Sequence, residues 1–433
     1  MKHALALAAL VAAWPALAHA DATTYQGTLD GKPIVVEFSD APDPKNSELF
    51  GRYFYVDQGA DIPLHATKAQ RSRLGLVEEV PCDKDKNNCP HAQDDTPSDP
   101  PLGAKWELEV SGDGKTLEGD FKLNGRNLPV KLELYGTRAF DASGGMMTLA
   151  DFAMGLWYQG TVLTPETSPY DYLKVTSIKL AEGDIKEMTG GSFRYVTDPR
   201  TKFQFPRIVS LTEGDPAAAN AYLDQRHWRA NLDALYCVSQ QYQGFGWGIY
   251  NYDAGTLGWW DEEVIEVHYL TPSIMTFTES GSLSCGGAHP YNHYEYYNLD
   301  VKAGQLIDMS RIFKGWIARD WDGNIVALET ARATPGDYQW GPDEELLAFI
   351  NAHRPTNEEL GFPTEGDDAC PIDDLIASNL AISFNGNDNV HFGMDGVEYA
   401  VFACATDLYD APITELKDLL TPEAADYFPA LKD

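Results

Sequence analysis

The sequence lacks an apolar run long enough to cross a bilayer. A transmembrane helix needs about 20 consecutive apolar residues, and the apolar run near the start, Ala4–Ala13, is shorter. Signatures of several enzyme classes are missing too, among them the GxSxG elbow, the HExxH motif and a glycine loop for phosphate. We therefore expect no membrane span and no cofactor, and the absences favour a protein that is not an enzyme.

Basic residues are also few. Lysine and arginine number 32 against 66 aspartate and glutamate residues, which gives a net charge of −34. A field of this sign repels nucleic acid and anionic lipid, and it attracts basic partners through forces that salt screens. We expect no nucleic-acid partner and consider a basic partner, although solubility alone would also explain the charge.

A secretory signal is present at the start of the chain. Lys2 precedes the apolar run, and the small-residue ending Ala18-His19-Ala20 follows it, which is the pattern of a signal peptide. We predict that residues 1–20 are removed and that the mature protein, starting at Asp21, is periplasmic or secreted. No cysteine follows the cleavage site directly, so a lipid anchor is not expected.

All six cysteines lie in the mature part. An even number in an oxidising compartment indicates disulfide bonds, and no CxxC spacing suggests a zinc or redox site. Six cysteines allow 15 pairings, and the sequence alone does not choose among them. Proximity favours the first pair below, and we predict the other two with it: Cys82 with Cys89, Cys237 with Cys285, and Cys370 with Cys404.

Residues 21–140 alternate apolar and polar side chains, which is the period of β-strands. Two such runs flank Asp30-Gly31, the dipeptide of a tight hairpin. Further along, Trp106, Leu108 and Val110 would face a core while the glutamates between them face water. Short strands with turn residues and no helical period predict an all-β meander or barrel-like domain.

Residues 141–433 mix helical and strand patterns. A helix should begin at Asp215-Pro216, and the positions that share its buried face are Leu223, Ala230, Ala234 and Cys237. We also expect strands at 264–269, 293–301, 381–384 and 397–404, and short helices at 342–353 and 413–420. This interleaving lacks the regular alternation of a parallel sheet, so we predict an α+β module with antiparallel sheet, divisible into subdomains 141–240 and 241–433.

Two motifs in this half carry a resemblance. GGAHP at residues 286–290 is followed by YNLD at 297–300, and upstream a strand-like run ending in proline precedes the predicted helix. From about residue 192 onward the chain resembles the linked domains of unknown function that occur in peptidoglycan deacetylases and in lysozyme-sensing anti-sigma factors. The resemblance implies an envelope-facing binding or sensing module. No deacetylase catalytic domain is recognisable in the remaining residues.

Side-chain chemistry gives a separate interpretation of the GGAHP segment. Glycines permit a tight turn, and Pro290 favours an extended backbone before it. In an extended chain, alternate side chains share one face, which here would carry His289, Tyr291, His293, Glu295 and Tyr297. Two imidazoles and a carboxylate would suit a metal ion, whereas a hydrogen-bonded polar face needs none. We name no metal ligand and predict that the ligand contacts Gly286, Gly287, His289, Tyr291 and His293.

Tryptophans next to glycines form the other unusual feature. Trp247, Trp259 and Trp260 lie in a stretch rich in aromatic residues. Rigid aromatic surface suits recognition of protein or carbohydrate, although such residues are often simply buried. We predict that these three bind ligand. The carboxylates of 261–263 beside them would suit glycoside hydrolysis, but a solvated strand end is the commoner situation, so we predict no catalytic residue.

These observations predict an exported envelope protein that binds or senses a cell-wall-related partner. The partner would be a basic extracellular protein of the lysozyme type or a cell-wall glycan. One alternative is a metal-dependent, peptidoglycan-directed hydrolase that uses His289, His293 and Glu295, and another is a non-catalytic accessory protein. The sequence leaves the ligand and the oligomeric state open.

Overall fold

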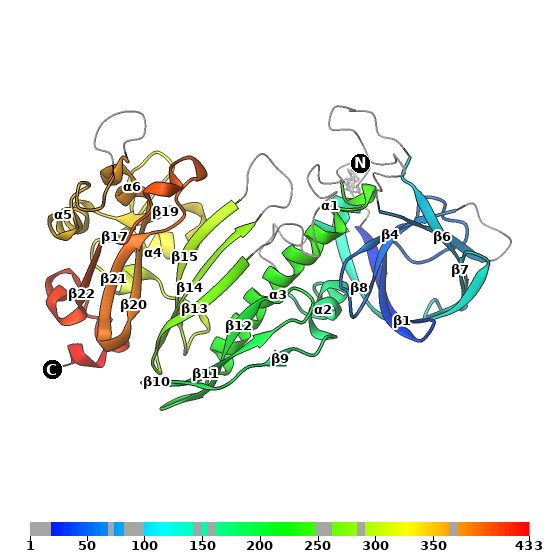
Figure 1. Cartoon of the computed structure of the whole chain (residues 1–433), viewed down its shortest axis with the longest axis horizontal. Helices are drawn as coiled ribbons and strands as arrows, with labels where there is room; N and C mark the ends of the chain where they lie inside the picture. Colours follow the sequence, from blue (N-terminus) through cyan, green and yellow to red (C-terminus); the bar gives the residue numbers. More distant parts are fainter. Residues whose placement is uncertain are drawn as a thin grey trace, which may run out of the picture. The chain divides into compact units, whose positions relative to one another are not determined.

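The structure, a computed structural model, divides the chain into two compact units (Figure 1). The first comprises Met1–Thr176 with Ser239–Trp247, and the second comprises Ser177–Val238 with Gly248–Asp433. The structure describes residues 19–67, 73–81, 99–141, 149–154, 162–246, 262–283, 291–362 and 370–432. A β-barrel followed by a mixed unit with antiparallel sheets confirms the predicted α+β class.

The described strands of the first unit form a closed antiparallel barrel, visible in blue and cyan in Figure 1. Each strand pairs with the next, and the last pairs back with the first. The strands are β1 (His19–Leu29), β2 (Lys32–Phe38), β3 (Phe50–Tyr55), β4 (Ile62–Ala66), β5 (Leu74–Glu79), β6 (Leu102–Val110), β7 (Thr116–Leu123) and β8 (Arg126–Asp141). The barrel-like prediction is therefore confirmed, with β1 starting just before the expected cleavage site.

Local sequence explains two of the barrel's turns. Asp30 and Gly31 have φ angles of 51° and 78°, and a two-residue hairpin turn of type I′ requires positive values at both positions. Asn124 and Gly125 join β7 to β8 with φ angles of 50° and 76°. The Asp-Gly hairpin expected from the sequence is confirmed.

The barrel is filled by side chains from one face of each strand. Trp106 and Leu108 are 1% and 0% exposed, as the alternation predicts, and Val110 packs half-buried beside them. Tyr53 lies edge-to-face on Trp106, with ring centroids 5.0 Å apart, and donates a hydrogen bond of 2.7 Å to Glu78. The interior is thus a packed core that encloses the Tyr53–Glu78 hydrogen bond.

Buried charges lie on the outer side of the barrel, beneath helix α2 (Pro169–Thr176). Arg52 alternates with core residue Tyr53, so it points outward, and its guanidinium contacts acidic side chains at 2.8 to 3.3 Å. Opposite charges satisfy one another, which is what burial of charge requires. The network combines three bases and three acids: Arg52, Arg138, Lys174, Glu37, Asp61 and Asp171. Helix α1 (Leu149–Met154) and the 3₁₀ turn η2 (Gln243–Phe245) complete the described part of this unit.

The second unit begins with a small antiparallel sheet and a long helix. The sheet contains β9 (Ala181–Glu182), β10 (Lys186–Met188), β11 (Gly191–Thr197) and β12 (Gln204–Leu211). Helix α3 (Ala217–Ser239) follows, and the carboxylate of Asp215 accepts the N–H of Ala217 at its start. Leu223, Ala234 and Cys237 are 0% exposed and Ala230 is partly buried, which confirms the predicted buried face.

The central sheet of this unit lies between α3 and the C-terminal part. Its strands, each antiparallel to the next, are β13 (Glu262–Leu270), β14 (Ile274–Leu283), β15 (Tyr291–Asp300) and β16 (Gln305–Leu306). On one face, Phe277 packs in an apolar cluster with Leu223 of α3. On the other, the Asn298 amide donates a 2.6 Å hydrogen bond to the Ile382 carbonyl. The two faces therefore have different neighbours.

The C-terminal part adds two three-stranded antiparallel sheets among the described residues. Their strands are β17 (Trp316–Arg319), β18 (Ile325–Val326) and β19 (Gln339–Pro342), and β20 (Leu380–Asn385), β21 (Asn389–Met394) and β22 (Tyr409–Pro412). The α-helices are α4 (Leu328–Ala333), α5 (Glu344–His353), α6 (Ile372–Asn379) and α7 (Ala424–Tyr427). The 3₁₀ turns are η3 (Met309–Arg311), η4 (Pro335–Asp337), η5 (Gly386–Asp388), η6 (Tyr399–Cys404), η7 (Ile413–Leu419) and η8 (Pro429–Leu431).

Two predictions of secondary structure need correction here. The strand expected at 397–404 is wrong, because Tyr399–Cys404 forms the 3₁₀ turn η6. The helix expected at 413–420 is 3₁₀ rather than α. A short apolar run fits a strand and a buried helical turn equally well, and here Val397 and Cys404 both enter the C-terminal core.

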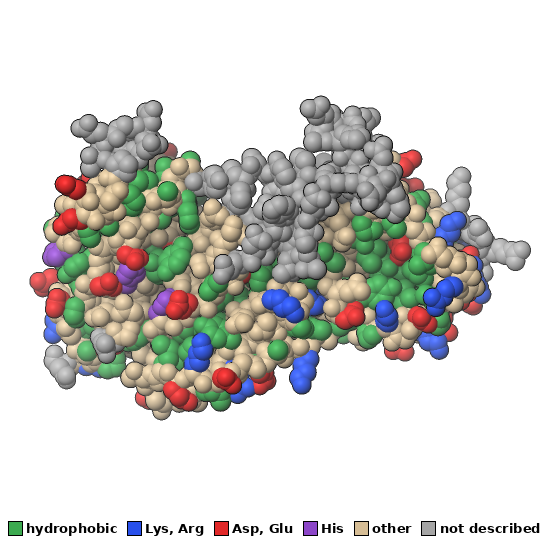
Figure 2. Space-filling model, viewed as in Figure 1, with side chains coloured by type: hydrophobic (Ala, Val, Ile, Leu, Met, Phe, Trp, Pro, Cys, Tyr) green, Lys and Arg blue, Asp and Glu red, His purple; other side chains and the backbone are tan. Residues whose placement is uncertain are grey.

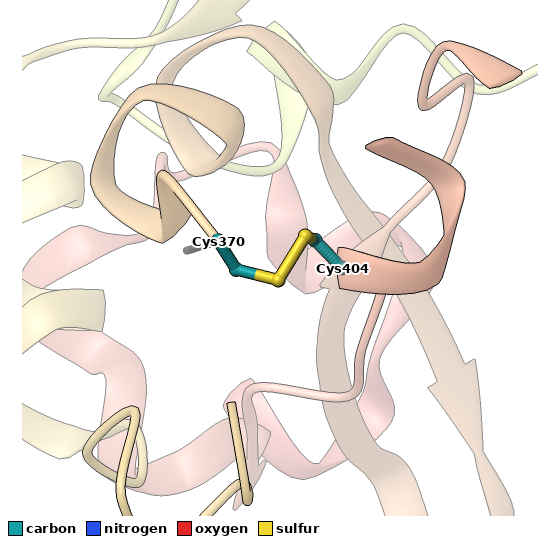
Figure 3. Close-up of a disulfide and its surroundings, with 2 residues drawn as sticks. All are labelled: Cys370 and Cys404. Atoms are coloured by element: carbon teal, nitrogen blue, oxygen red, sulfur yellow. A yellow bond between two sulfur atoms is a disulfide. The ribbon is translucent and has the colours of Figure 1, made fainter. Parts of the chain in front are cut away.

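A disulfide holds η6 in place. Cys370, just before α6, is bonded to Cys404 at the end of η6 (Figure 3), which confirms that predicted pair. Cys237 is also disulfide-bonded, but its predicted partner Cys285 lies outside the described residues, as do Cys82 and Cys89. Within the ranges that the structure describes, no helix has the length and apolar character needed to cross a membrane.

Candidate binding site

The segments singled out by the sequence attach to one end of the central sheet. The strand register pairs Glu262 with Ser282 and Leu283 with Tyr291. The starts of β13 and β15 and the end of β14 therefore lie together. The tryptophan-rich segment leads into β13 and the GGAHP segment joins β14 to β15. Both connect to the sheet at this end.

Most of the predicted contact residues fall outside the part of the chain that the structure describes. His293 lies in β15, and the structure describes its side chain. Tyr291 lies in the same strand, but only its backbone is among the described parts. The others remain predictions: Gly286, Gly287, His289, Trp247, Trp259 and Trp260. The described residues here are those of the strands β13, β14 and β15, to which these segments are connected.

On the face towards α3, His293 pairs with Glu263 across the central strand. Both residues flank Gly281 in the register, and the absence of a glycine side chain leaves room for them to meet. The His293 Nε2 atom lies 3.2 Å from a Glu263 carboxylate oxygen, and the two side chains are 9% and 5% exposed. Burial disfavours the imidazolium, but the hydrogen bond and charge of Glu263 outweigh it and raise the pKa of His293. Glu263 is thus not a solvated strand end, contrary to the interpretation from the sequence.

Two residues further along the strands, on the same face, an ion pair connects α3 to the sheet. Arg226 donates two hydrogen bonds to Glu279 of β14, at 2.8 and 2.6 Å, and its guanidinium lies 3.9 Å from the centroid of the Tyr297 ring. Burial raises the pKa of Glu279, and the Arg226 contact opposes that rise. Tyr297 in turn donates to Glu295. His293, Glu295 and Tyr297 therefore share one face, as predicted. This face packs against helix α3.

Asp233 adds a titratable carboxylate near the His293–Glu263 pair. It lies on α3 and is open to solvent on one side, yet the protein around it raises its pKa to about 7 by desolvation; Arg229 opposes the rise and Glu263 adds to it. Apart from Asp233, the carboxylates and the imidazole of the α3 face are largely buried, with Glu279, Glu263 and His293 less than 10% exposed. This face offers little area for a macromolecule to touch.

The opposite face of the same strands is open to solvent near this end of the sheet, although Thr276, Thr278 and Asn298 further along it are buried. Val264 and Tyr294 stand on either side of Ser280 in the register and are 41% and 39% exposed. One row further, the Tyr296 hydroxyl lies 3.1 Å from Nε2 of His391 in β21. The rings of Tyr294 and Tyr296 pack edge-to-face with centroids 5.2 Å apart. An accessible aromatic surface results.

Three aspartates lie around Tyr296 and His391. Asp407 and Asp410 lie 3.2 and 3.1 Å from the two nitrogens of His391, and their side chains are 79% and 60% exposed. Asp395 accepts the backbone N–H of Tyr296 at 3.5 Å; burial raises its pKa to about 6, against the lowering effect of that hydrogen bond and with a further rise from Glu295. We call the whole group the tyrosine-aspartate patch: Tyr294, Tyr296, His391, Asp395, Asp407 and Asp410. Figure 2 shows histidine side chains beside acidic ones at the surface over the C-terminal sheets.

Sequence reasoning missed the members of this patch that lie outside β15. His391, Asp395, Asp407 and Asp410 come from β21, the loop after it and the start of β22, and no short motif links them to the tyrosines. One signal is Gly393, which shares a strand face with His391. A Cβ atom at that position would lie 3.0 Å from the Tyr296 hydroxyl, so the glycine leaves room for this contact.

The chemistry of the patch suits a cation. Exposed carboxylates and tyrosine faces bind ammonium and guanidinium groups through charge-assisted hydrogen bonds and cation–π contact. Among the residues that the structure describes, no group of three or more His, Cys, Asp or Glu side chains is arranged to hold a metal ion. No protein-family model matches the chain, and no curated protein matches it either.

Proposed function

We propose that this chain is an exported cell-envelope protein whose second unit binds a basic extracellular protein of the lysozyme type. The observation that carries the proposal is the tyrosine-aspartate patch. It presents two mostly exposed carboxylates, Asp407 and Asp410, next to a partly exposed tyrosine pair. Lysine and arginine side chains are the protein groups that fit such a surface.

Two features of the sequence support the same proposal. The net charge of −34 steers a basic protein towards this one and repels nucleic acid and anionic lipid. The signal-like segment at residues 1–20 and the resemblance of the second half to lysozyme-sensing envelope modules agree on the location and the kind of partner. The YNLD motif of that resemblance lies within β15, the strand that supplies the patch tyrosines.

Binding to lysozyme tests the proposal. The change is Asp407→Asn combined with Asp410→Asn, and the control is Glu415→Gln combined with Asp418→Asn, which removes the same charge from exposed positions of η7. We expect the wild-type protein to bind lysozyme at low salt and to lose about tenfold or more in affinity between about 20 and 300 mM NaCl, because salt screens exposed charges.

The two variants separate a local site from a general charge effect. The patch variant should bind at least about fivefold more weakly than the control at low salt, a difference of about 1 kcal/mol. Calorimetry or a surface-binding assay measures it. Absence of any association with lysozyme at low salt would overturn the proposed function, and equal loss in both variants would remove the patch from it.

A further inference from the structure

One edge of β15 has no neighbouring strand over most of its length in the described structure. Its other edge pairs with β14 throughout, whereas β16 pairs only with Leu299 and Asp300. In an antiparallel ladder, the backbone groups of successive residues point to opposite edges. The Asn298 carbonyl accepts the N–H of Ile307 on the β16 side, and the N–H of Val301 donates to Ser273 on the β14 side. Even-numbered residues of β15 therefore direct their backbone groups to the open edge.

The unpaired groups belong to Asn292 and Tyr294. Within the described residues, neither the N–H nor the C=O of either has a hydrogen-bond partner. The N–H of Tyr296 reaches only the Asp395 carboxylate, at 3.5 Å. Proteins block an open edge with lysine, proline, a bulge, an inward-pointing charge or a covering loop, and here Glu295 points inward and η6 lies against part of β15. The segment Asn292–Tyr296 contains no lysine or proline, and its pairing with β14 shows no register shift.

Acidic side chains line both sides of this edge. A strand added here would place alternate side chains on the two faces of the sheet. On the outer face it would meet the tyrosines and Asp407 of the patch, and on the inner face it would meet Glu295, while the basic groups of that face, His293 and Arg226, are already paired with Glu263 and Glu279. Charge complementarity therefore selects a segment that carries lysine or arginine rather than an acidic one.

We propose that the β15 edge from Asn292 to Tyr296 takes up an extended, lysine- or arginine-bearing segment of the partner as an added β-strand. Main-chain hydrogen bonds to Asn292 and Tyr294 contribute affinity, and the patch selects the basic side chains. This inference rests on the proposed function and adds the way in which the partner is held. The added strand would lie beside the same edge of β15 that β16 pairs with at Leu299 and Asp300.

A peptide probe tests this mode of binding directly. The probe is a short, capped peptide of alternating lysine and valine, compared with two versions of identical sequence and charge. One version is N-methylated at the lysine amides and the other at the valine amides. N-methylation removes donors along one edge only. We expect the full-length protein to bind the unmodified peptide and to lose about tenfold or more in affinity for at least one methylated version.

Two readouts on the protein side complete the test. The amide hydrogens of Asn292 and Tyr294 should exchange more slowly when the peptide is bound. Tyr294→Pro, which removes an N–H on the open edge where proline is tolerated, should weaken binding more than Tyr294→Ala, which removes only the ring. An unchanged thermal unfolding transition verifies that both variants are folded.

The outcomes distinguish this inference from the proposed function. If both methylated peptides bind as well as the unmodified one, or if the two amides stay unprotected in the complex, the added strand is ruled out. The same holds if the unmodified peptide does not bind. Lysozyme binding that depends on Asp407 and Asp410 would still support the proposed function in each of these cases.

Discussion

At the level of a single side chain, Asp395 of the patch should make the stability of the protein depend on pH. It is half-buried beside β15 and accepts the Tyr296 N–H, and burial raises its pKa to about 6. An aspartate in an unfolded chain has a pKa of about 3.9. Between these two values the folded protein binds the proton more tightly than the unfolded chain. Stability therefore decreases as the pH rises through this window and stays level above it.

Replacing Asp395 with asparagine should remove this pH dependence. Asparagine retains an oxygen acceptor for Tyr296 but has no charge to bury. We expect Asp395→Asn to be more stable than the wild type by about 1 to 2 kcal/mol at pH 8 and equal to it near pH 4. Urea unfolding at both pH values measures the difference. A variant that is less stable at pH 8 would mean that the charged carboxylate is favourable where it lies.

At the level of elements, the Arg226–Glu279 contact joins α3 to the central sheet. Arg226→Met leaves Glu279 buried without its partner, since the Glu279 side chain is 8% exposed. We expect a loss of about 2 to 3 kcal/mol for this change. Arg226→Met combined with Glu279→Gln removes both charges and should fall within about 1 kcal/mol of the wild type. Denaturant unfolding of the single and double variants gives the coupling, and an additive double variant would show that the two groups do not interact.

The sequence predicted elements well wherever one residue type dictates local geometry. The Asp30-Gly31 turn, the alternation through Trp106 and Leu108, and the face of α3 that carries Cys237 are all present. Predictions were wrong in the C-terminal part, where Tyr399–Cys404 is a 3₁₀ turn. That turn is fixed by the disulfide to Cys370, a contact between distant residues that no local period reveals.

The candidate site was predictable only in part, and for the same reason. Alternation placed His293, Glu295 and Tyr297 on one face, but it did not indicate that α3 covers this face through Arg226. The patch depends on β21 lying against β15, which brings His391 to Tyr296. A single sequence predicts which side chains share a face of a strand, but it does not predict which element packs against that face.

At the level of the whole molecule, several of the acids that the structure shows buried are paired with bases. The buried network of the first unit contains three acids and three bases, and the buried Glu279 is paired with Arg226. Paired charges cancel at a distance, so these buried groups add little to the field of a chain whose net charge is −34. Salt-dependent association is consequently expected of the whole protein, and variants such as Asp407→Asn are needed to assign it to one place.

The disulfide Cys370–Cys404 should stabilise the second unit selectively. The bond closes a loop with a sequence separation of 34, for which the chain-entropy argument gives about 3 to 4 kcal/mol. We expect Cys370→Ser with Cys404→Ser to increase hydrogen exchange in β20 and β21 and to leave the barrel strands β2 and β6 unchanged, because the chain divides into two compact units. Local exchange measured by mass spectrometry reports on each unit separately. Faster exchange in the barrel as well would show that the two units unfold as one.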